Sequence, residues 1–337
     1  MHEPFETFQP RGFLATLGLV ILFFLGCNLL LLAVFPFLTP GTTVGITNTK
    51  WKMLEETKGF SGGVLLGDST ASMCIDPDIL ASETRMPWIN MGTYGDFGVF
   101  DDAVMLSRMI ETGWDIRAII VSHSYDAFNR ELSGRALADI PWYLRLPWLK
   151  LPSMREDKTT FECLLRDLFP VYYRQDSLAH LLKLDPLRLV NWENQIRKGF
   201  LDPKDETSNL ERDVPSHLKH LRSESAREIS RSNSQSIVSL IRTAAAHDIP
   251  VLFISGPILE SVWKAPEYQR AIGAINTFID TAAADNSSIK SDFLNQAVLP
   301  AGNMNRVDHV NSASVPNFTK HVARQWNRFE EVLAAPP

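Results

Sequence analysis

The chain lacks a long basic run, an internal repeat and paired cysteines at the spacing of metal ligands. Its formal net charge of −6 is spread over 337 residues, which argues against nucleic acid as a partner. The three cysteines, Cys27, Cys74 and Cys163, allow at most one disulfide, between Cys74 and Cys163, and free thiols are the simpler expectation. No glycine-rich loop follows a strand and the acidic residues show no metal-ligand spacing, so we expect no cofactor and no metal.

A long apolar run occupies the first 40 residues. It extends from Gly12 to Leu38 without a charged residue, and as a helix it would cross ~30 Å of hydrocarbon. A cleaved signal peptide has a shorter apolar region that ends at a small-residue site, whereas Pro36 and then Thr39 and Pro40 end this run. The letters LGCN around Cys27 are similar to a lipoprotein processing site, but the apolar run continues well beyond them. We therefore predict an uncleaved transmembrane anchor at 12–38, the alternative being a buried helix of a soluble domain.

The charges that flank this anchor do not decide its orientation, since Arg11 lies on one side and Lys50 and Lys52 lie on the other. A short N-terminal tail before a single apolar run is typical of a signal anchor. We therefore expect residues 1–11 to form a cytoplasmic tail. A connector at 39–59 would then lead to an extracytoplasmic domain, in the periplasm or at the cell surface.

Beyond the connector, short apolar runs alternate with helical patterns. The runs at 63–66, 118–121 and 250–254 are apolar on both faces, as in central parallel strands. Apolar residues at helical spacing follow at 101–112 and 223–247. This alternation predicts a doubly wound α/β sheet, whose chemistry would lie at the C-terminal ends of the strands.

Residues 140–222 break the rhythm of the domain, which we expect to occupy residues 60–337. They are rich in Trp, Tyr, Leu, Pro and Arg and end in a charged stretch. We interpret them as a helical insertion at the edge of the sheet. The insertion could cap the site, lie against the membrane surface, where aromatic and basic residues are favoured, or pack a core of its own.

The stretch VLLGDSTASM places Ser69 where an apolar run meets small, helix-compatible residues. On such a strand-to-helix turn a serine hydroxyl is exposed, and its own N–H faces a developing oxyanion. The alternative is that Asp68 or Ser69 only caps the helix. A serine nucleophile also needs a base. Among the eight histidines, His123 and His309 are the candidates, and His309 stands in a polar loop before the terminal helix.

Four stretches resemble the motif blocks of the SGNH (GDSL-type) hydrolase superfamily: LLGDST, WINMGTYGDFG, AIIVSHSYDAF and DHVNSASVPNFT. The resemblance covers roughly residues 60–130 and 235–328. It implies a three-layer α/β/α flavodoxin-like fold. It also implies that Ser69 is the nucleophile, that His309 is the general base and then the acid, and that the N–H groups of Ser69 and Gly92 lie in the oxyanion hole.

Two positions depart from the family pattern. Arg306 stands where the family has the acid that orients the histidine, and the nearest acid is Asp308. Either Asp308 reaches the imidazole by another path, or a Ser–His dyad works with help from the backbone. The third block lacks the asparagine that donates to the oxyanion, so Ser124 is the candidate third donor, with Ser122 and His123 as alternatives and Asn90 as a further one.

The layout of anchor, domain and insertion is similar to that of membrane-anchored members such as alginate O-acetylation proteins and the D-alanyl transfer protein of teichoic acid modification. The resemblance implies a serine esterase or O-acyltransferase that passes an acyl group, acetyl first among the candidates, to an extracytoplasmic glycan or to water. Its partners would be that glycan, membrane lipid and a multi-spanning membrane acyltransferase.

Two alternative functions remain open at this point. The departures from the family pattern suggest a catalytically impaired glycan-binding or assembly module of a polysaccharide modification system. The aromatic insertion suggests instead a lipid esterase on the extracytoplasmic side, with the insertion as a lid that faces the lipid.

Overall fold

The computed structural model describes residues 10–38, 43–132, 196–201, 210–222 and 228–334, together with positions 134, 137, 161 and 165. Most of the insertion expected at 140–222 lies outside the described residues, and so does Cys163. The parts of it that are described form a small hairpin, β4 (Ile196–Arg197) and β5 (Phe200–Leu201), and one helix, α11 (Leu210–Leu221).

The centre of the domain is a five-stranded sheet in which every neighbouring pair is parallel, in the order β2-β1-β3-β6-β8. This is the strand order of flavodoxin-like, doubly wound α/β folds. The central strands are buried on both faces apart from their first residues, which is what a sheet covered by helices on both sides requires. The strands are β1 (Ser61–Gly67), β2 (Trp88–Asn90), β3 (Asp115–His123), β6 (Val251–Ser255) and β8 (Ile289–Ser291).

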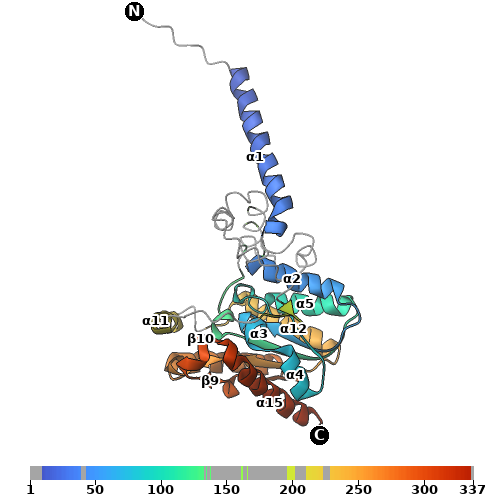
Figure 1. Ribbon diagram of the computed structural model, residues 1–337, viewed down its shortest axis with the longest axis vertical. Helices are drawn as coiled ribbons and strands as arrows, with labels where there is room; N and C mark the ends of the chain where they lie inside the picture. Colours follow the sequence, from blue (N-terminus) through green and yellow to red (C-terminus); the bar gives the residue numbers. More distant parts are fainter. Residues whose placement is uncertain are drawn as a thin grey trace, which may run out of the picture.

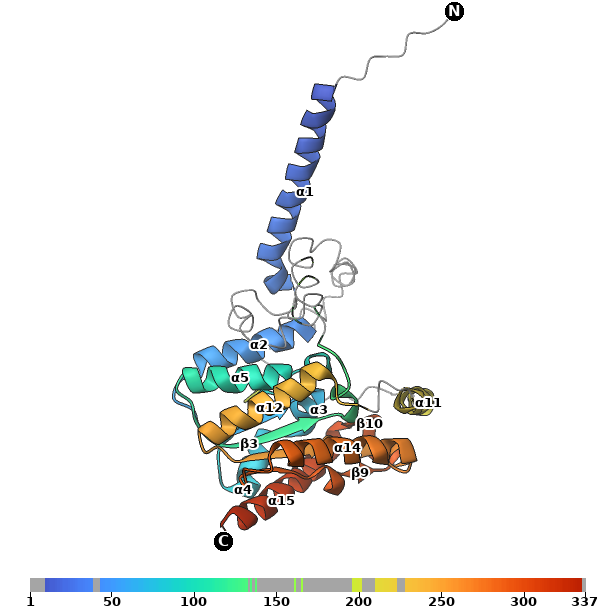
Figure 2. The same ribbon diagram turned by 180° about the vertical axis from the view of Figure 1, so that it is seen from behind.

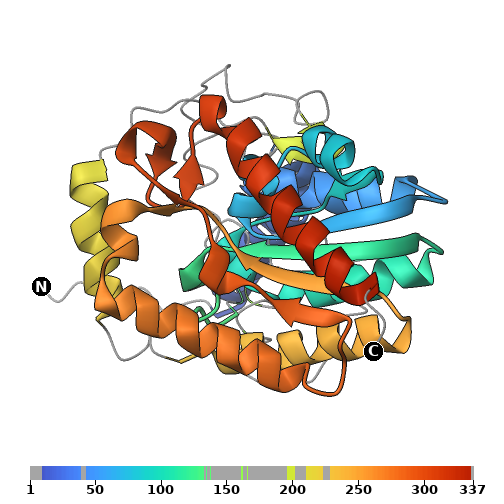
Figure 3. The same cartoon turned by 90° about the horizontal axis from the view of Figure 1, so that it is seen from below.

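Helices cover both faces of the sheet (Figure 3). On one face α5 packs against α12 and α2, and α12 also contacts α14 (Figure 2). On the other face α15 packs against α4 and α3. The helices are α2 (Thr43–Glu56), α3 (Ser69–Cys74), α4 (Pro77–Thr84), α5 (Phe100–Glu111), α12 (Arg231–Ala246), α13 (Glu260–Trp263), α14 (Pro266–Ala282) and α15 (Val315–Ala334).

The predicted α/β architecture is confirmed. The runs expected at 63–66 and 118–121 lie within β1 and β3, and the run expected at 250–254 is β6 shifted by one residue. The helix expected at 101–112 is α5. The helix expected at 223–247 is shorter than predicted: α12 begins at Arg231, and residues 223–227 lie outside the described residues. Most of the connector predicted at 39–59 is the helix α2, which buries Trp51 and Leu54 in the domain core. Cys74 is a buried free thiol.

The N-terminal helix α1 (Pro10–Leu38) projects away from the domain (Figure 1). Its segment Gly12–Leu30 is long and apolar enough to span a membrane, and most of its large apolar side chains are exposed. The buried core helix considered as an alternative would hide these side chains. Polar groups of this segment bond to the helix itself: the Asn28 amide donates to the Phe24 carbonyl at 2.7 Å, as transmembrane helices require.

Candidate active site

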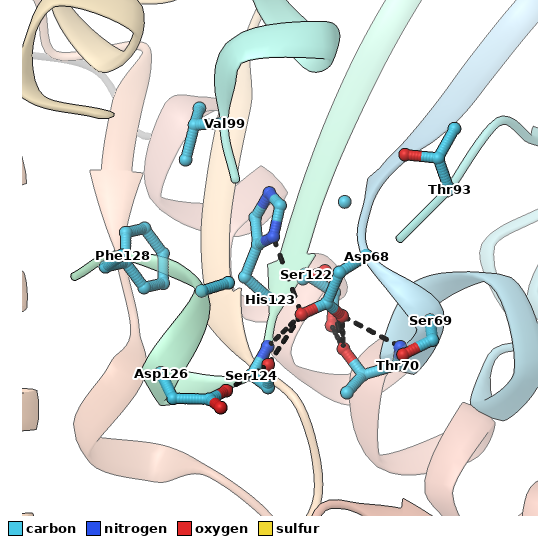
Figure 4. Close-up of polar contacts among 12 residues, drawn as sticks. Asp68, Ser69, Thr70, Thr93, Val99, Ser122, His123, Ser124, Asp126 and Phe128 are labelled. Carbon is cyan, nitrogen blue, oxygen red and sulfur yellow. Dashed lines mark hydrogen bonds and ion pairs between the residues drawn. The ribbon is translucent and has the colours of Figure 1, made fainter. Parts of the chain in front are cut away.

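Ser69 is the first residue of α3, and only Asp68 separates it from the end of β1. Asp68 is the cap of the helix, because its Oδ1 accepts from the Thr70 N–H at 2.8 Å and from the Thr70 hydroxyl at 2.7 Å. Figure 4 shows Asp68 between Thr70 on one side and Ser124 on the other. Since Asp68 satisfies the helix terminus, the Ser69 side chain is left to contact another partner.

The turn before Ser69 depends on a glycine. Gly67 has φ of +129°, and a Cβ at this position would lie 1.8 Å from the Ser122 carbonyl oxygen of the neighbouring strand β3. Its N–H donates to the Asp102 carboxylate at 2.8 Å. Only glycine combines this backbone conformation with so close an approach of two strands.

We expect Gly67→Ala to destabilise the protein by about 3 kcal/mol, since the new methyl group must push β1 and β3 apart in a strained conformation. Thermal unfolding of the detergent-solubilised chain, followed by circular dichroism, measures this effect. Gly273→Ala is the matched control, because Gly273 lies within α14 with open space around it and alanine is the better helix former. Equal unfolding temperatures for Gly67→Ala and the wild type would contradict the prediction.

His309 reaches Ser69 from the other end of the chain. It begins β11 (His309–Val310), which pairs antiparallel with β10 (Met304–Arg306) in a hairpin that contacts α3. Its Nε2 lies 2.9 Å from the Ser69 Oγ, and its Nδ1 lies 2.6 Å from the Asp308 Oδ1. The buried residue Val307 fixes the turn of this hairpin, because its carbonyl accepts from the Leu259 N–H at 2.9 Å.

The structure therefore brings Ser69, His309 and Asp308 together in one hydrogen-bonded chain. Of the two alternatives left open by the sequence, this geometry matches the one in which Asp308 reaches the imidazole. The two-residue turn of the hairpin allows an acid adjacent to the histidine to reach it. Arg306, which stands three residues before the histidine, is exposed; it pairs with His309 in the backbone register of the hairpin, and its positive charge lowers the pKa of His309.

The electrostatics of this chain suit a general base. The Asp308 and His309 side chains are only 15% and 13% exposed. Burial lowers the pKa of His309, but the Asp308 carboxylate outweighs it and the net pKa is raised above the ordinary value. Burial likewise raises the pKa of Asp308, and the facing imidazole reverses this and holds the pKa below its usual range.

Most of the predicted oxyanion donors already have acceptors within the protein. The Gly92 N–H donates to the Asn90 Oδ1 at 3.0 Å, within the loop that follows β2. The Ser124 N–H donates to Asp68 Oδ2 at 2.8 Å, and its hydroxyl lies 2.6 Å from Asp68 Oδ2 and 2.8 Å from Asp126 Oδ1, either of which can accept its one proton. The N–H of Ser69, at the first position of α3, has no acceptor within the helix. The oxyanion roles of Ser69, Gly92 and Ser124 stay predictions.

The other candidate donors have different partners. His123 is fully buried and its Nε2 lies 2.6 Å from the Asp102 Oδ2, so it does not reach the surface where a substrate would bind. Ser122 is also buried, and its hydroxyl lies 3.4 Å from the Thr70 hydroxyl. The Asn90 amide donates to the carbonyls of Ala71 and Ile75 in and after α3. These side chains are thus engaged with other groups of the protein, and the alternatives of Ser122, His123 and Asn90 as oxyanion donors stay predictions, like that of Ser124.

Sequence reasoning missed the polar cluster beneath the serine. Asp102 was interpreted only as part of the acidic start of a helix, yet it accepts from the Gly67 N–H in the turn before Ser69. Asp126 accepts from the Ser124 hydroxyl at 2.8 Å and pairs with Arg130 at 2.5 Å. The only sequence signal for this cluster was the number of acidic residues near the expected C-terminal ends of strands.

In comparisons with known proteins, no family model and no curated protein matched the chain.

Proposed function

We propose that the protein is a serine acyl esterase or O-acyltransferase of the SGNH type. The observation that carries the proposal is the chain of contacts from Ser69 Oγ through His309 to Asp308, at the C-terminal edge of a parallel sheet. Three side chains from two distant parts of the sequence have the order and spacing that nucleophilic catalysis by serine needs. The flavodoxin-like strand order supports the same superfamily.

The geometry gives each residue a step. Ser69 Oγ attacks the carbonyl carbon of an ester while His309 Nε2 takes the hydroxyl proton, and Asp308 holds the imidazole by its Nδ1–H. His309 then gives the proton to the leaving alcohol, and an acyl group remains on Ser69. A water molecule or a glycan hydroxyl, deprotonated by His309, attacks this acyl group and releases the serine.

The membrane-spanning character of α1 supports an acceptor at a membrane. We propose that residues 12–38 anchor the protein in a cell membrane with the domain on the extracytoplasmic side, and that the acceptor is a cell-surface glycan. Acetyl is the first acyl group to test. A multi-spanning membrane acyltransferase would be the donor partner, since acyl groups from the cytoplasm must cross the bilayer to reach Ser69.

A second candidate function, a glycan-binding or assembly module without catalysis, is favoured by one observation. The Gly92 N–H and both donors of Ser124 are already bonded within the protein. An oxyanion hole that lacks one donor typically loses about 3 kcal/mol of transition-state stabilisation. The lid of the lipid-esterase alternative would be formed by the insertion, most of which lies outside the described residues.

A serine-directed fluorophosphonate probe tests the proposal. The full chain in detergent should release nitrophenol from p-nitrophenyl acetate, and the probe should label it once, at Ser69, as located by mass spectrometry of the peptides. A preceding incubation with the probe should abolish the release of nitrophenol. A folded sample that is neither labelled nor active would refute the catalytic proposal and favour the binding module.

A further inference from the structure

His123 is a buried titratable residue that the proposed chemistry does not use. It ends β3, next to the C-terminal end of β1, and its side chain is fully buried. Its Nε2 lies 2.6 Å from the Asp102 Oδ2, and its Nδ1 lies 3.7 Å from the Asp68 Oδ2. Only Nε2 is within hydrogen-bond distance of a carboxylate, while the buried Nδ1 has no hydrogen-bond partner among the described residues and faces the Asp68 carboxylate across the longer gap. A proton on both nitrogens is favoured electrostatically, because each faces a carboxylate oxygen.

The two carboxylates beside His123 hold successive residues of the nucleophile turn. Asp102 accepts from the Gly67 N–H through its second oxygen. Asp68 itself precedes Ser69 and caps α3, and its backbone N–H donates to the Ser122 carbonyl at 3.2 Å. The imidazole thus lies between the two acids that fix the backbone directly before Ser69, and Figure 4 shows it beside Asp68.

The charge of this cluster also matters for catalysis. Asp68 is fully buried, and although burial raises its pKa, the contacts with His123, Ser124 and Thr70 reverse this and hold the pKa well below its usual range. A buried carboxylate adjacent to the nucleophile would oppose the negative charge that develops on the substrate oxygen. A positive imidazolium between Asp102 and Asp68 weakens that unfavourable field, since it offsets part of the negative charge of the two carboxylates.

We propose that His123 is a positioning residue, a buried imidazolium that ties Asp102 to Asp68, fixes the turn that carries Ser69 and offsets the charge of Asp68 during acyl transfer. The inference rests on the proposed function. Of the described side chains around the ring, Asp102 and Asp101 come from α5, Asp68 comes from the turn after β1, and Phe128 stacks edge-on at 5.4 Å. Burial and the neighbouring Asp102 raise the pKa of Asp101 well above its usual range.

The protonation state of His123 gives a readout that does not depend on activity. Burial lowers the pKa of His123, but the carboxylates of Asp102 and Asp68 outweigh the effect of burial and raise the pKa to about 10. A group whose pKa is raised on folding stabilises the protein fully below its unfolded value, about 6.5, and loses this contribution as the pH rises through its folded value. The stability contributed by His123 should therefore decline between pH 6.5 and about 10.

The test compares His123→Gln with the wild type and with His247→Gln, a change of an exposed histidine, in the full detergent-solubilised chain. For p-nitrophenyl acetate we expect His123→Gln to lower kcat by about 100-fold with little change in KM, because the change displaces the Ser69 hydroxyl and leaves the substrate-binding surface intact. The stability difference between wild type and His123→Gln should shrink between pH 7 and 10. His247→Gln should match the wild type in both measurements.

A wild-type kcat in His123→Gln, or a stability difference that does not vary with pH, would overturn the proposal. If His123→Gln does not fold, Asp102→Asn is tested in its place. Because Asp102 raises the pKa of His123, this variant should lose stability at a lower pH than the wild type does. An unchanged midpoint of the alkaline loss of stability would contradict a charged His123. If the wild type itself has no activity that depends on Ser69, the proposed function fails. The pH dependence of unfolding still decides whether His123 is the charged link between Asp102 and Asp68.

Discussion

Replacing Ser69 or His309 with alanine should lower kcat for a short acyl ester by at least about 10⁴-fold. Without Ser69 no acyl-enzyme forms, and without His309 the hydroxyl proton has no acceptor at 2.9 Å. Because the two residues act as one unit, the double variant should be no slower than either single variant. Steady-state hydrolysis of p-nitrophenyl acetate measures kcat, and fluorophosphonate labelling should be lost in Ser69→Ala and strongly slowed in His309→Ala.

Matched controls exist for both positions. Ser82 is an exposed serine of α4 and His247 is an exposed histidine after α12, so Ser82→Ala and His247→Ala should keep the wild-type kcat. If kcat of Ser69→Ala or of His309→Ala equals that of the wild type, any measured hydrolysis comes from elsewhere and the catalytic proposal fails. Losses that multiply in the double variant would show that Ser69 and His309 act independently.

The central part of the fold could be predicted from sequence because its signals are local. The apolar runs of β1, β3 and β6 are buried on both faces, so their residue types alone mark them. The outer strands β2 and β8 have three residues each, too few for a pattern to stand out. Their pairing depends on backbone bonds to neighbours, which composition does not record.

Helix α2 shows a second limit of local signals. Its sequence is polar enough to resemble a connector, yet the helix buries Trp51 and even Lys50. The Lys50 ammonium donates to backbone carbonyls of Asn90, at 2.7 Å, and of Gly199. Those acceptors lie far away in the sequence, so only the folded chain shows why a lysine is tolerated there.

In the candidate site, Ser69 and His309 could be chosen from sequence because each lies both in a recognisable motif and at an expected loop: Ser69 at a strand-to-helix turn and His309 before the terminal helix. The partner of His309 and the oxyanion donors could not be assigned from spacing. A hairpin with a two-residue turn lets Asp308 curl back to its neighbour, which no fixed spacing would predict. Which donors face a substrate depends on bonds such as that from Ser124 to Asp68, and these join residues 56 positions apart.

The contact between Asp308 and His309 makes the second large prediction. Asp308→Asn should lower kcat by about 10³- to 10⁴-fold, because an amide can donate to Nδ1 and so leave the proton on Nε2, where the imidazole cannot accept from Ser69. Asp285→Asn, a change of an exposed acid, is the control. A kcat within about tenfold of the wild type in Asp308→Asn would instead support the Ser–His dyad, since the histidine would then need no acid.

The dependence of kcat/KM on pH tests the contribution of the negative charge of Asp308, because asparagine keeps the shape of the side chain and removes the charge. Catalysis needs neutral His309, whose pKa burial lowers and Asp308 raises to a net value above normal. In the wild type kcat/KM should therefore rise with pH through a midpoint above about 6.5, the ordinary histidine value. Asp308→Asn removes the carboxylate that raises the pKa, so the residual activity should rise at lower pH than in the wild type. An unmoved midpoint would show that another group controls the protonation of His309.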